Sequence, residues 1–170
     1  MPFVRIDALG ADRNRLDALS RAVHDALVQT IGFPPDDRFQ VVVGHDGVGS
    51  TLHYDDYLGV HRDDGMVYVA ITMRSGRTPG QKQALYRRIA ELAQEYADTA
   101  PRNVCVVLTE NESVDWSFGN GVAQYVDSCG TAGPAVPQES DGPEESDGPS
   151  PAAASKCRPI PHGPATAGRA

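Results

Sequence analysis

The residue with the greatest chemical potential in this sequence is the second one. The chain begins Met-Pro, and an extended apolar stretch, PFVRID, starts at once. Methionine is normally removed when proline follows it, which would leave Pro2 with a free secondary amine. Such an amine could act as a base in an apolar pocket, act as an acid beside a carboxylate, or form an iminium with a carbonyl substrate. Many proteins begin Met-Pro without consequence, but a strand that starts immediately would hold the terminus inside the fold.

Two pairs of charged side chains could assist that amine. Asp36 and Asp37 follow two prolines in FPPDDRFQ, just before a predicted strand, although aspartate is also an ordinary turn residue. Arg74 and Arg77 in TMRSGRT lie at a predicted strand-to-helix junction. Arginine there can bind a carboxylate through two parallel hydrogen bonds, and the helix N-terminus favours an anion. Arginines at the ends of elements also commonly face water.

Aromatic residues and histidines are the remaining candidates. Trp116, the only tryptophan, and Phe118 lie in a Gly-rich segment after the last predicted strand, which indicates either a pocket wall or a subunit contact. His45, His53 and His61 recur every eight residues in a Gly- and Asp-rich stretch. A metal site is one interpretation, but this spacing is not typical of metal ligands, and we expect an ordinary loop or hairpin without a metal.

Two similar β-α-β units are predicted to position these residues. Each has a strand, a helix with apolar residues on one face of a 3.6-residue period, and a second strand. The predicted elements are a strand from residue 2, a helix at about 12–31, a strand in FQVVVGHD, a strand in GMVYVAITMR, a helix at about 79–97 and a strand in NVCVVLTEN. Asp12 and Thr78 are expected to cap the helices, and Gly32 to end the first. Right-handed crossovers predict an α+β fold with one four-stranded sheet and both helices on one face.

The strands themselves predict an assembly. The runs VVV and VYVAI are apolar at nearly every position, which indicates burial on both faces of the sheet. Helices on one face would leave the other uncovered. We therefore expect other copies of the chain to cover it, and a monomer in solution would contradict this expectation.

Composition narrows the class of protein. The formal net charge of −8 disfavours a nucleic acid or an anionic membrane as a partner. No stretch is apolar and long enough to span a membrane, and the N-terminus is not typical of a signal peptide. The three cysteines lack the spacing of a disulfide framework or a zinc site, which fits a cytoplasmic protein. A folded domain at 2–130 is expected to precede a disordered tail at 131–170 that is rich in Gly, Pro, Ser and acidic residues.

Together these features resemble the tautomerase superfamily, whose members have an amino-terminal catalytic proline and a β-α-β fold that occurs twice in the longer chains. The resemblance spans about residues 2–128. Within the superfamily, the sequence is most similar to the malonate semialdehyde decarboxylase group. Three motifs in order carry this similarity: GxPxxDRxQ at 32–40, GRTxxQK at 76–82 and DWSFGxGxAQ at 115–124.

The resemblance implies roles for individual residues. Pro2 would be the catalytic amine, Asp37 would assist it or position water, and Arg77 would bind the substrate carboxylate. The family's second arginine falls at Ser75, so Arg74 is displaced by one position. In a regular strand its side chain would point to the other face, unless a bulge at Gly76 restored the direction.

The resemblance also implies an activity and an assembly. Trp116, Phe118 and Tyr125 would form the apolar pocket wall, with Tyr125 in place of a phenylalanine. The implied protein is a homotrimer that needs no cofactor and decarboxylates a small oxo acid similar to malonate semialdehyde. The alternatives are a keto–enol tautomerase acting on a phenylpyruvate-like enol, a hydratase or dehalogenase of the same superfamily, and a non-catalytic trimeric binding protein.

Overall fold

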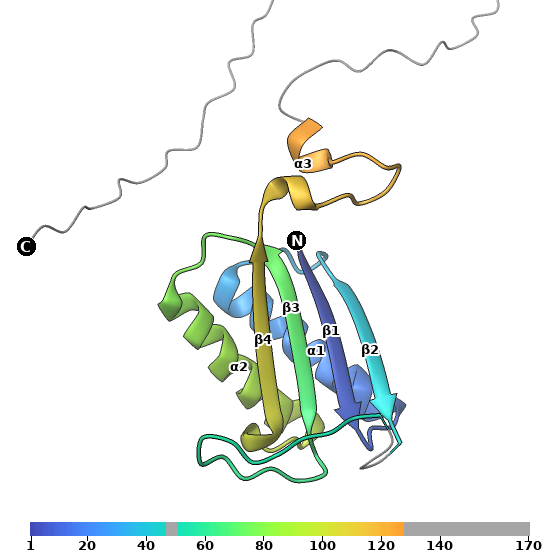
Figure 1. The fold of residues 1–170 in the computed structure, drawn as a ribbon, viewed down its shortest axis with the longest axis vertical. Helices are drawn as coiled ribbons and strands as arrows, with labels where there is room; N and C mark the ends of the chain where they lie inside the picture. The colour runs from blue at the N-terminus through green and yellow to red at the C-terminus, as the bar shows by residue number, and fades with distance from the viewer. Residues whose placement is uncertain (47–50, 128–170) are drawn as a thin grey trace, which may run out of the picture. The chain divides into compact units, whose positions relative to one another are not determined.

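The computed structural model describes residues 1–46 and 51–127, which belong to one compact unit spanning Met1–Thr131. The predicted tail lies outside the described residues. Figure 1 shows the arrangement of the elements. They are β1 (Pro2–Leu9), α1 (Arg13–Ile31), β2 (Phe39–His45), β3 (Val67–Arg74), α2 (Pro79–Ala97), η1 (Pro101–Asn103), β4 (Val104–Asn111), η2 (Ser113–Asp115) and α3 (Gln124–Asp127).

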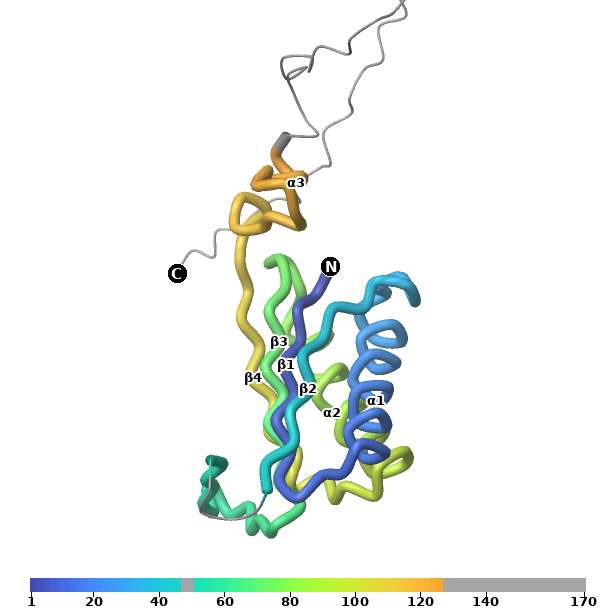
Figure 2. Tube along the Cα trace, turned by 90° about the vertical axis from the view of Figure 1, so that its right-hand side faces the viewer, coloured from blue at the N-terminus to red at the C-terminus, as the bar shows by residue number. Residues whose placement is uncertain are grey.

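The four strands form one sheet in the order β2-β1-β3-β4. The two outer pairs, β1 with β2 and β3 with β4, are parallel, whereas β1 and β3 are antiparallel. Both long helices lie on one face of this sheet (Figure 2). This architecture confirms the predicted α+β fold built from two β-α-β units.

Local signals in the sequence fix the ends of both long helices. The side chain of Asp12 accepts a hydrogen bond from the backbone N–H of Arg15 at 2.8 Å, and α1 ends at Gly32 with a left-handed φ of 79°. Thr78 and Gln81 form a reciprocal capping box at the start of α2. The predicted caps are therefore confirmed.

The core lies between the helices and the sheet. Along β1, Val4 and Ile6 are buried against the helices, whereas Phe3 and Arg5 point to the opposite, open face. Burying a large aliphatic side chain such as Ile6 contributes about 1.5–3 kcal/mol. The helices bring apolar residues to the same core, among them Leu19, Val23, Leu85, Ile89 and Leu92.

The open face is covered only in part. Near one end of the sheet, Leu52 and Met66 pack on Leu9, and the half-buried strand residue Cys105 packs against this cluster. Elsewhere apolar side chains remain exposed on this face: Phe3 (42 %), Phe39 (49 %), Val41 (41 %) and Val107 (58 %). Within one chain the strands are thus not buried on both faces, and coverage by other copies stays a prediction. Among the described residues, no helix combines the length and hydropathy needed to cross a membrane.

Candidate active site

The sheet topology brings the candidate residues to one end of the sheet. Because β1 and β3 are antiparallel, Pro2 lies opposite Met73, next to the turn that carries Arg77. Because β1 and β2 are parallel, the turn before β2, which contains Asp37, reaches the same end. The segment after β4 also begins there, as Figure 1 shows.

The amino terminus lies between an acid and a phenol. The terminal nitrogen of Met1 is 3.3 Å from Oδ2 of Asp37 and donates a hydrogen bond of 3.4 Å to the hydroxyl of Tyr125. Pro2, the next residue, is buried. The fold therefore holds the start of the chain in place and surrounds it with groups that can exchange protons or stabilise a cation.

Only one of the two neighbouring aspartates approaches the terminus. Pro34 and Pro35 restrict the turn, and the backbone N–H of Asp37 donates to the carbonyl of Pro34 at 3.0 Å. Asp37 is half-buried and faces the terminal nitrogen, whereas Asp36 is exposed.

Arg74 reaches the site from a regular strand. Its pairing with Asn111 continues the β3–β4 register without a bulge, so its side chain points to the open face. There its guanidinium carbon lies 4.9 Å from the ring centroid of Tyr125, and Nη1 donates to Oγ of Ser113 at 3.4 Å. The bulge considered from the sequence is thus unnecessary, because the segment after β4 comes to Arg74.

Arg77 lies in the turn between β3 and α2. Nη1 donates to the carbonyl oxygen of Arg74 at 2.6 Å and to that of Ser75 at 3.4 Å. Its guanidinium carbon is 5.2 Å from the ring centroid of Phe33, in the segment that leads to Asp37. Ser75, between these two arginines, donates its hydroxyl to Oε1 of Glu112 at 2.9 Å.

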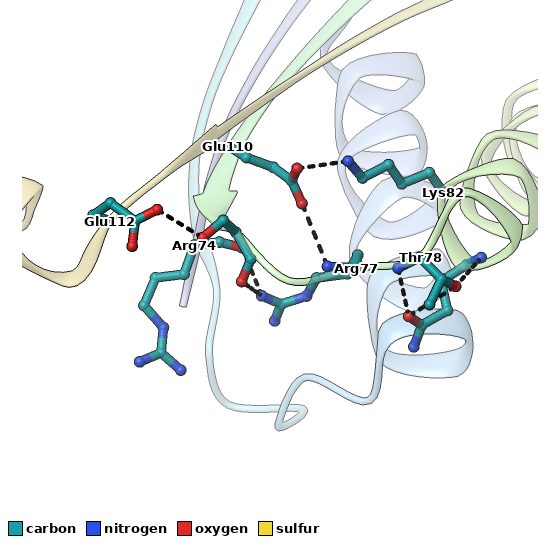
Figure 3. Close-up of polar contacts among 8 residues, drawn as sticks. Arg74, Arg77, Thr78, Lys82, Glu110 and Glu112 are labelled. Atoms are coloured by element: carbon teal, nitrogen blue, oxygen red, sulfur yellow. Dashed lines mark hydrogen bonds and ion pairs between the residues drawn. The ribbon is translucent and has the colours of Figure 1, made fainter. Parts of the chain in front are cut away.

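An ion pair that the sequence analysis did not single out holds this turn (Figure 3). Oε2 of Glu110 on β4 lies 2.6 Å from Nζ of Lys82 on α2, and Oε1 accepts a 3.4 Å hydrogen bond from the backbone N–H of Arg77. The hydrogen bond from Lys82 lowers the pKa of the Glu110 carboxyl from its ordinary value. The sequence did hold a signal for this ion pair. Glu110 lies opposite the fully buried Met73 in the β3–β4 register, so its side chain points toward the helices. A carboxylate on that side of a strand requires a polar partner.

The predicted aromatic wall is assembled by the segment after β4. Trp116 is 9 % exposed and donates its indole N–H to Asn111 at 2.8 Å. It stacks on Phe118 with ring centroids 5.6 Å apart, and Phe118 meets Tyr125 edge-on at 5.0 Å. Tyr125 thus connects the wall, Arg74 and the amino terminus.

A separate polar cluster lies along β1 toward the other end of the open face. Asp7 accepts hydrogen bonds from Arg5 at 2.7 Å and from Nε2 of His45 at 2.9 Å, and Nδ1 of His45 lies 2.6 Å from Oγ1 of Thr51. The bond from Arg5 lowers the pKa of Asp7 from its ordinary value. These groups line a hollow of about 310 Å³. Because they satisfy one another and none contacts Pro2, this cluster is separate from the site at the amino terminus.

Comparison with known proteins agrees with this geometry. Two family models described as tautomerase enzyme match residues 2–61 and 37–119. The probable tautomerase YusQ of Bacillus subtilis is 39 % identical over 129 residues, which are 75 % of this chain and all of that protein. The probable tautomerase YrdN of the same organism is 33 % identical over 74 % of this chain and 97 % of its own length.

Solved structures also show similarity to proteins of this fold. FG41 malonate semialdehyde decarboxylase inhibited by 3-bromopropiolate is 35 % identical, with a TM-score of 0.68 over 74 % of this chain and 95 % of that chain. A fused 4-OT described as a symmetric trimer shares the fold at 21 % identity, with a TM-score of 0.59 over 74 % of this chain and 98 % of that one. With its amino terminus, acid, arginines and aromatic wall at one end of a tandem β-α-β sheet, the chain belongs to the tautomerase superfamily.

Proposed function

We propose that this chain, once Met1 is removed, is a cofactor-independent enzyme that uses the amine of Pro2 to decarboxylate a 3-oxo acid similar to malonate semialdehyde. The observation that carries the proposal is the meeting of the amino terminus with Asp37 and Tyr125, beside Arg74 and Arg77. The similarity to malonate semialdehyde decarboxylase over nearly the whole of that chain supports the choice of substrate class.

Asp37 would favour the protonated form of the Pro2 amine, because an opposite charge nearby stabilises a cation. Loss of carbon dioxide from a 3-oxo acid leaves an electron pair on the α-carbon, which becomes an enolate or, after iminium formation, an enamine. A protonated amine donating to the carbonyl oxygen, or a Pro2 iminium, would stabilise that developing negative charge.

The arginines would hold the substrate carboxylate. Arg77 is anchored through Nη1 to two carbonyl oxygens, and Arg74 lies over Tyr125, so both guanidinium groups are already positioned. A carboxylate held out of the carbonyl plane has its breaking bond aligned with the π system. Trp116 and Phe118 would form the apolar side of this pocket.

The chain is also proposed to work as a homotrimer. The apolar side chains exposed on the open face of the sheet support self-association. The fused 4-OT of the same fold is described as a trimer.

Keto–enol tautomerisation is the second candidate, favoured by the fact that the curated relatives are named as probable tautomerases. In that reaction a neutral Pro2 would be the base, and activity would rise with pH as the amine loses its proton. In the decarboxylase the amine must be protonated, so activity would fall over the same range. A pH–rate profile on both substrates separates the two reactions. A hydration assay belongs in the same panel, because a solved relative is described as having decarboxylase and hydratase activities.

The decisive first experiment is intact-mass measurement of the purified protein. Retention of Met1 would block the Pro2 amine and favour a non-catalytic binding protein. If Met1 is absent, Pro2→Ala should lose most of the activity, because a primary amine in a different geometry replaces the secondary amine. Wild-type turnover in that variant would refute the mechanism, and borohydride reduction with substrate followed by mass measurement would distinguish an iminium from hydrogen-bond catalysis.

The neighbouring aspartates supply a matched pair of variants. Asp37→Asn removes the carboxylate that lies beside the amino terminus, whereas Asp36→Asn makes the same change on the exposed side of the same turn. We expect the first to lower kcat and shift the pH profile, and the second to leave both unchanged. Equal effects from both variants would contradict the proposed role of Asp37.

A further inference from the structure

A second group of chemically active side chains lies at the end of the sheet farthest from the amino terminus (Figure 1). Asp7 is on β1, His45 is the last residue of β2, and Thr51 lies in the segment that leads to β3. The structure joins the imidazole of His45 to an acid on one side and to a hydroxyl group on the other. This chain of three groups is separate from the proposed site at the amino terminus.

The hydrogen bonds of His45 assign different roles to its two ring nitrogens. Nε2 lies 2.9 Å from Oδ1 of Asp7, and Nδ1 lies 2.6 Å from Oγ1 of Thr51. A carboxylate can only accept a hydrogen bond, so in the neutral imidazole Nε2 carries the proton and is the donor. Nδ1 is then the unprotonated nitrogen and accepts from the Thr51 hydroxyl. The imidazole is therefore placed as a base toward Thr51.

Asp7 is held in its charged form. Nε and Nη2 of Arg5 donate to its two carboxylate oxygens at 2.7 and 2.9 Å, and hydrogen bonding to Arg5 lowers the pKa of Asp7 from its ordinary value. An ionised Asp7 orients the imidazole of His45 and stabilises the imidazolium ion that forms when Nδ1 takes a proton. The side chains of Asp7 and His45 are only 19 % and 14 % exposed, so this interaction is partly sheltered from water.

The three groups have the geometry of an activated nucleophile. A threonine hydroxyl is a weak nucleophile alone, and it is activated by a base within hydrogen-bond reach that a third group orients. Such an arrangement is recognised by its geometry, whatever the order of the residues along the chain. Thr51 is exposed, so its hydroxyl oxygen is accessible to a substrate.

The hollow of about 310 Å³ beside these groups provides space for a small substrate. Leu52 and the ring of Tyr68, which lies opposite Asp7 in the β1–β3 register, give it an apolar side. Asp7 uses Nε and Nη2 of Arg5, so Nη1 is the guanidinium nitrogen left for a developing negative charge. Phe3 and Phe39, which belong to the apolar surface proposed to support self-association, lie toward the other end of the sheet.

We propose that Thr51, His45 and Asp7 form a second active site, which hydrolyses small uncharged esters through an acyl intermediate on Thr51. Oγ1 of Thr51 attacks the ester carbonyl carbon, and Nδ1 of His45 takes the hydroxyl proton. The carbonyl electron pair moves to its oxygen, where Arg5 stabilises the charge, and returns as the bond to the alcohol breaks. The alcohol leaves with the proton from Nδ1. Water then attacks the acyl group in the same way, which releases the acid and restores Thr51.

The test is hydrolysis of p-nitrophenyl acetate by the full chain, followed by the release of p-nitrophenol. Acid quenching and peptide mass mapping then locate the acetyl group, which should be on Thr51. Thr51→Val keeps the shape of the side chain but removes the hydroxyl, and it should lower the rate at least tenfold. Thr51→Ser restores a hydroxyl and should retain activity, and urea unfolding of both variants shows whether the fold is intact.

His61 supplies a matched control for His45. Its Nδ1 also lies 2.6 Å from a carboxylate, that of Asp56, but its side chain is 84 % exposed and does not line the hollow. His45→Gln should lower the rate of ester hydrolysis at least tenfold, whereas His61→Gln should leave it unchanged.

Three results would overturn the inference. The first is a wild-type rate no higher than that of spontaneous hydrolysis, and the second is a rate that Thr51→Val leaves unchanged or that His61→Gln lowers as much as His45→Gln does. The third is an acetyl group found only on the amino terminus, where a free amine can also be acylated. None of these results bears on the proposed decarboxylation, which uses Pro2 and is measured with a different substrate.

Discussion

The ion pair between Glu110 and Lys82 should stabilise the turn that carries Arg77. Two variants isolate it: Lys82→Met keeps most of the aliphatic stem and removes the charge, and Glu110→Gln keeps the shape of the side chain. The double variant completes a cycle whose coupling energy measures the pair itself. The exposed pair of Arg88 with Glu91 on α2 is the matched control.

The expected magnitude follows from distance and burial. Nζ and Oε2 are 2.6 Å apart, and the side chains of Lys82 and Glu110 are 26 % and 25 % exposed. Hydrogen bonds to charged groups contribute about 1.5–3 kcal/mol when sheltered, and fully exposed ion pairs about 0.2–1 kcal/mol. A pair with intermediate exposure should therefore couple by about 1–2 kcal/mol, or roughly 4–8 °C in Tm for a domain of this size. The control pair should couple by less than about 0.5 kcal/mol.

The pH dependence has a definite sign. Lys82 lowers the pKa of Glu110 in the folded state, so the stabilisation is complete above the unfolded pKa of about 4.3. It is lost as the pH falls through the lower, folded pKa. The coupling should therefore be present at pH 7 and shrink in more acidic solution.

Urea unfolding of the four proteins, at one fixed protein concentration because assembly also contributes to stability, measures the cycle. Lys82→Met should also raise KM more than it lowers kcat, since the turn holds the arginine proposed to bind substrate. A coupling below about 0.3 kcal/mol at pH 7, within the usual error of additivity, would refute the structural role, as would a coupling that grows as the solution becomes more acidic.

Two further predictions concern the packing of β2 and the position of the aromatic wall. Gly44→Ala should destabilise the fold by about 1–3 kcal/mol in urea, because a Cβ there would lie 2.8 Å from the backbone oxygen of Ala11; unchanged stability would mean that β2 and the start of α1 separate easily. Asn111→Ala should shift the fluorescence of Trp116, the only tryptophan, to longer wavelength, because without the 2.8 Å hydrogen bond the buried indole should become more exposed to water; an identical spectrum would show that this bond does not hold the aromatic wall.

The sequence alone was sufficient to predict the architecture, and it named several residues that the structure brings to one end of the sheet. Asp12, Gly32 and Thr78 mark the helix ends through side-chain and backbone preferences that act over a few residues. The position of Asp37 beside the amino terminus, and of Arg77 in the turn after β3 at the same end of the sheet, agrees with the resemblance and with strand direction. Local rules are sufficient for these features because a helix cap depends on residues nearby in the sequence, and strand direction depends on the pairing of two strands.

The contacts that sequence reasoning missed are those that join separate segments. The direction of Arg74 depends on a regular β3–β4 register and also on the path of the chain after β4, which no local preference determines. Glu110 on β4 pairs with Lys82 on α2, and the two residues are 28 positions apart in the sequence. The apolar strand runs indicated burial on both faces, but a hydrophobic pattern does not identify what covers the second face.

The charges near the amino terminus match the movement of negative charge in the proposed decarboxylation. In the proposed site, the protonated amine, Arg74 and Arg77 would place three cations around the substrate, and these cations would attract an anionic substrate. In decarboxylation the negative charge does not leave with carbon dioxide; it moves from the carboxylate held by the arginines to the enolate oxygen beside the amine. Because the charge moves away from the arginines and toward the amine, the interaction with the amine is the one that would strengthen as the bond breaks, whereas the arginines would mainly bind and orient the substrate. In this structure Tyr125 contacts both Arg74 and the terminal nitrogen of Met1, the residue before Pro2, so its side chain lies between Arg74 and the start of the chain.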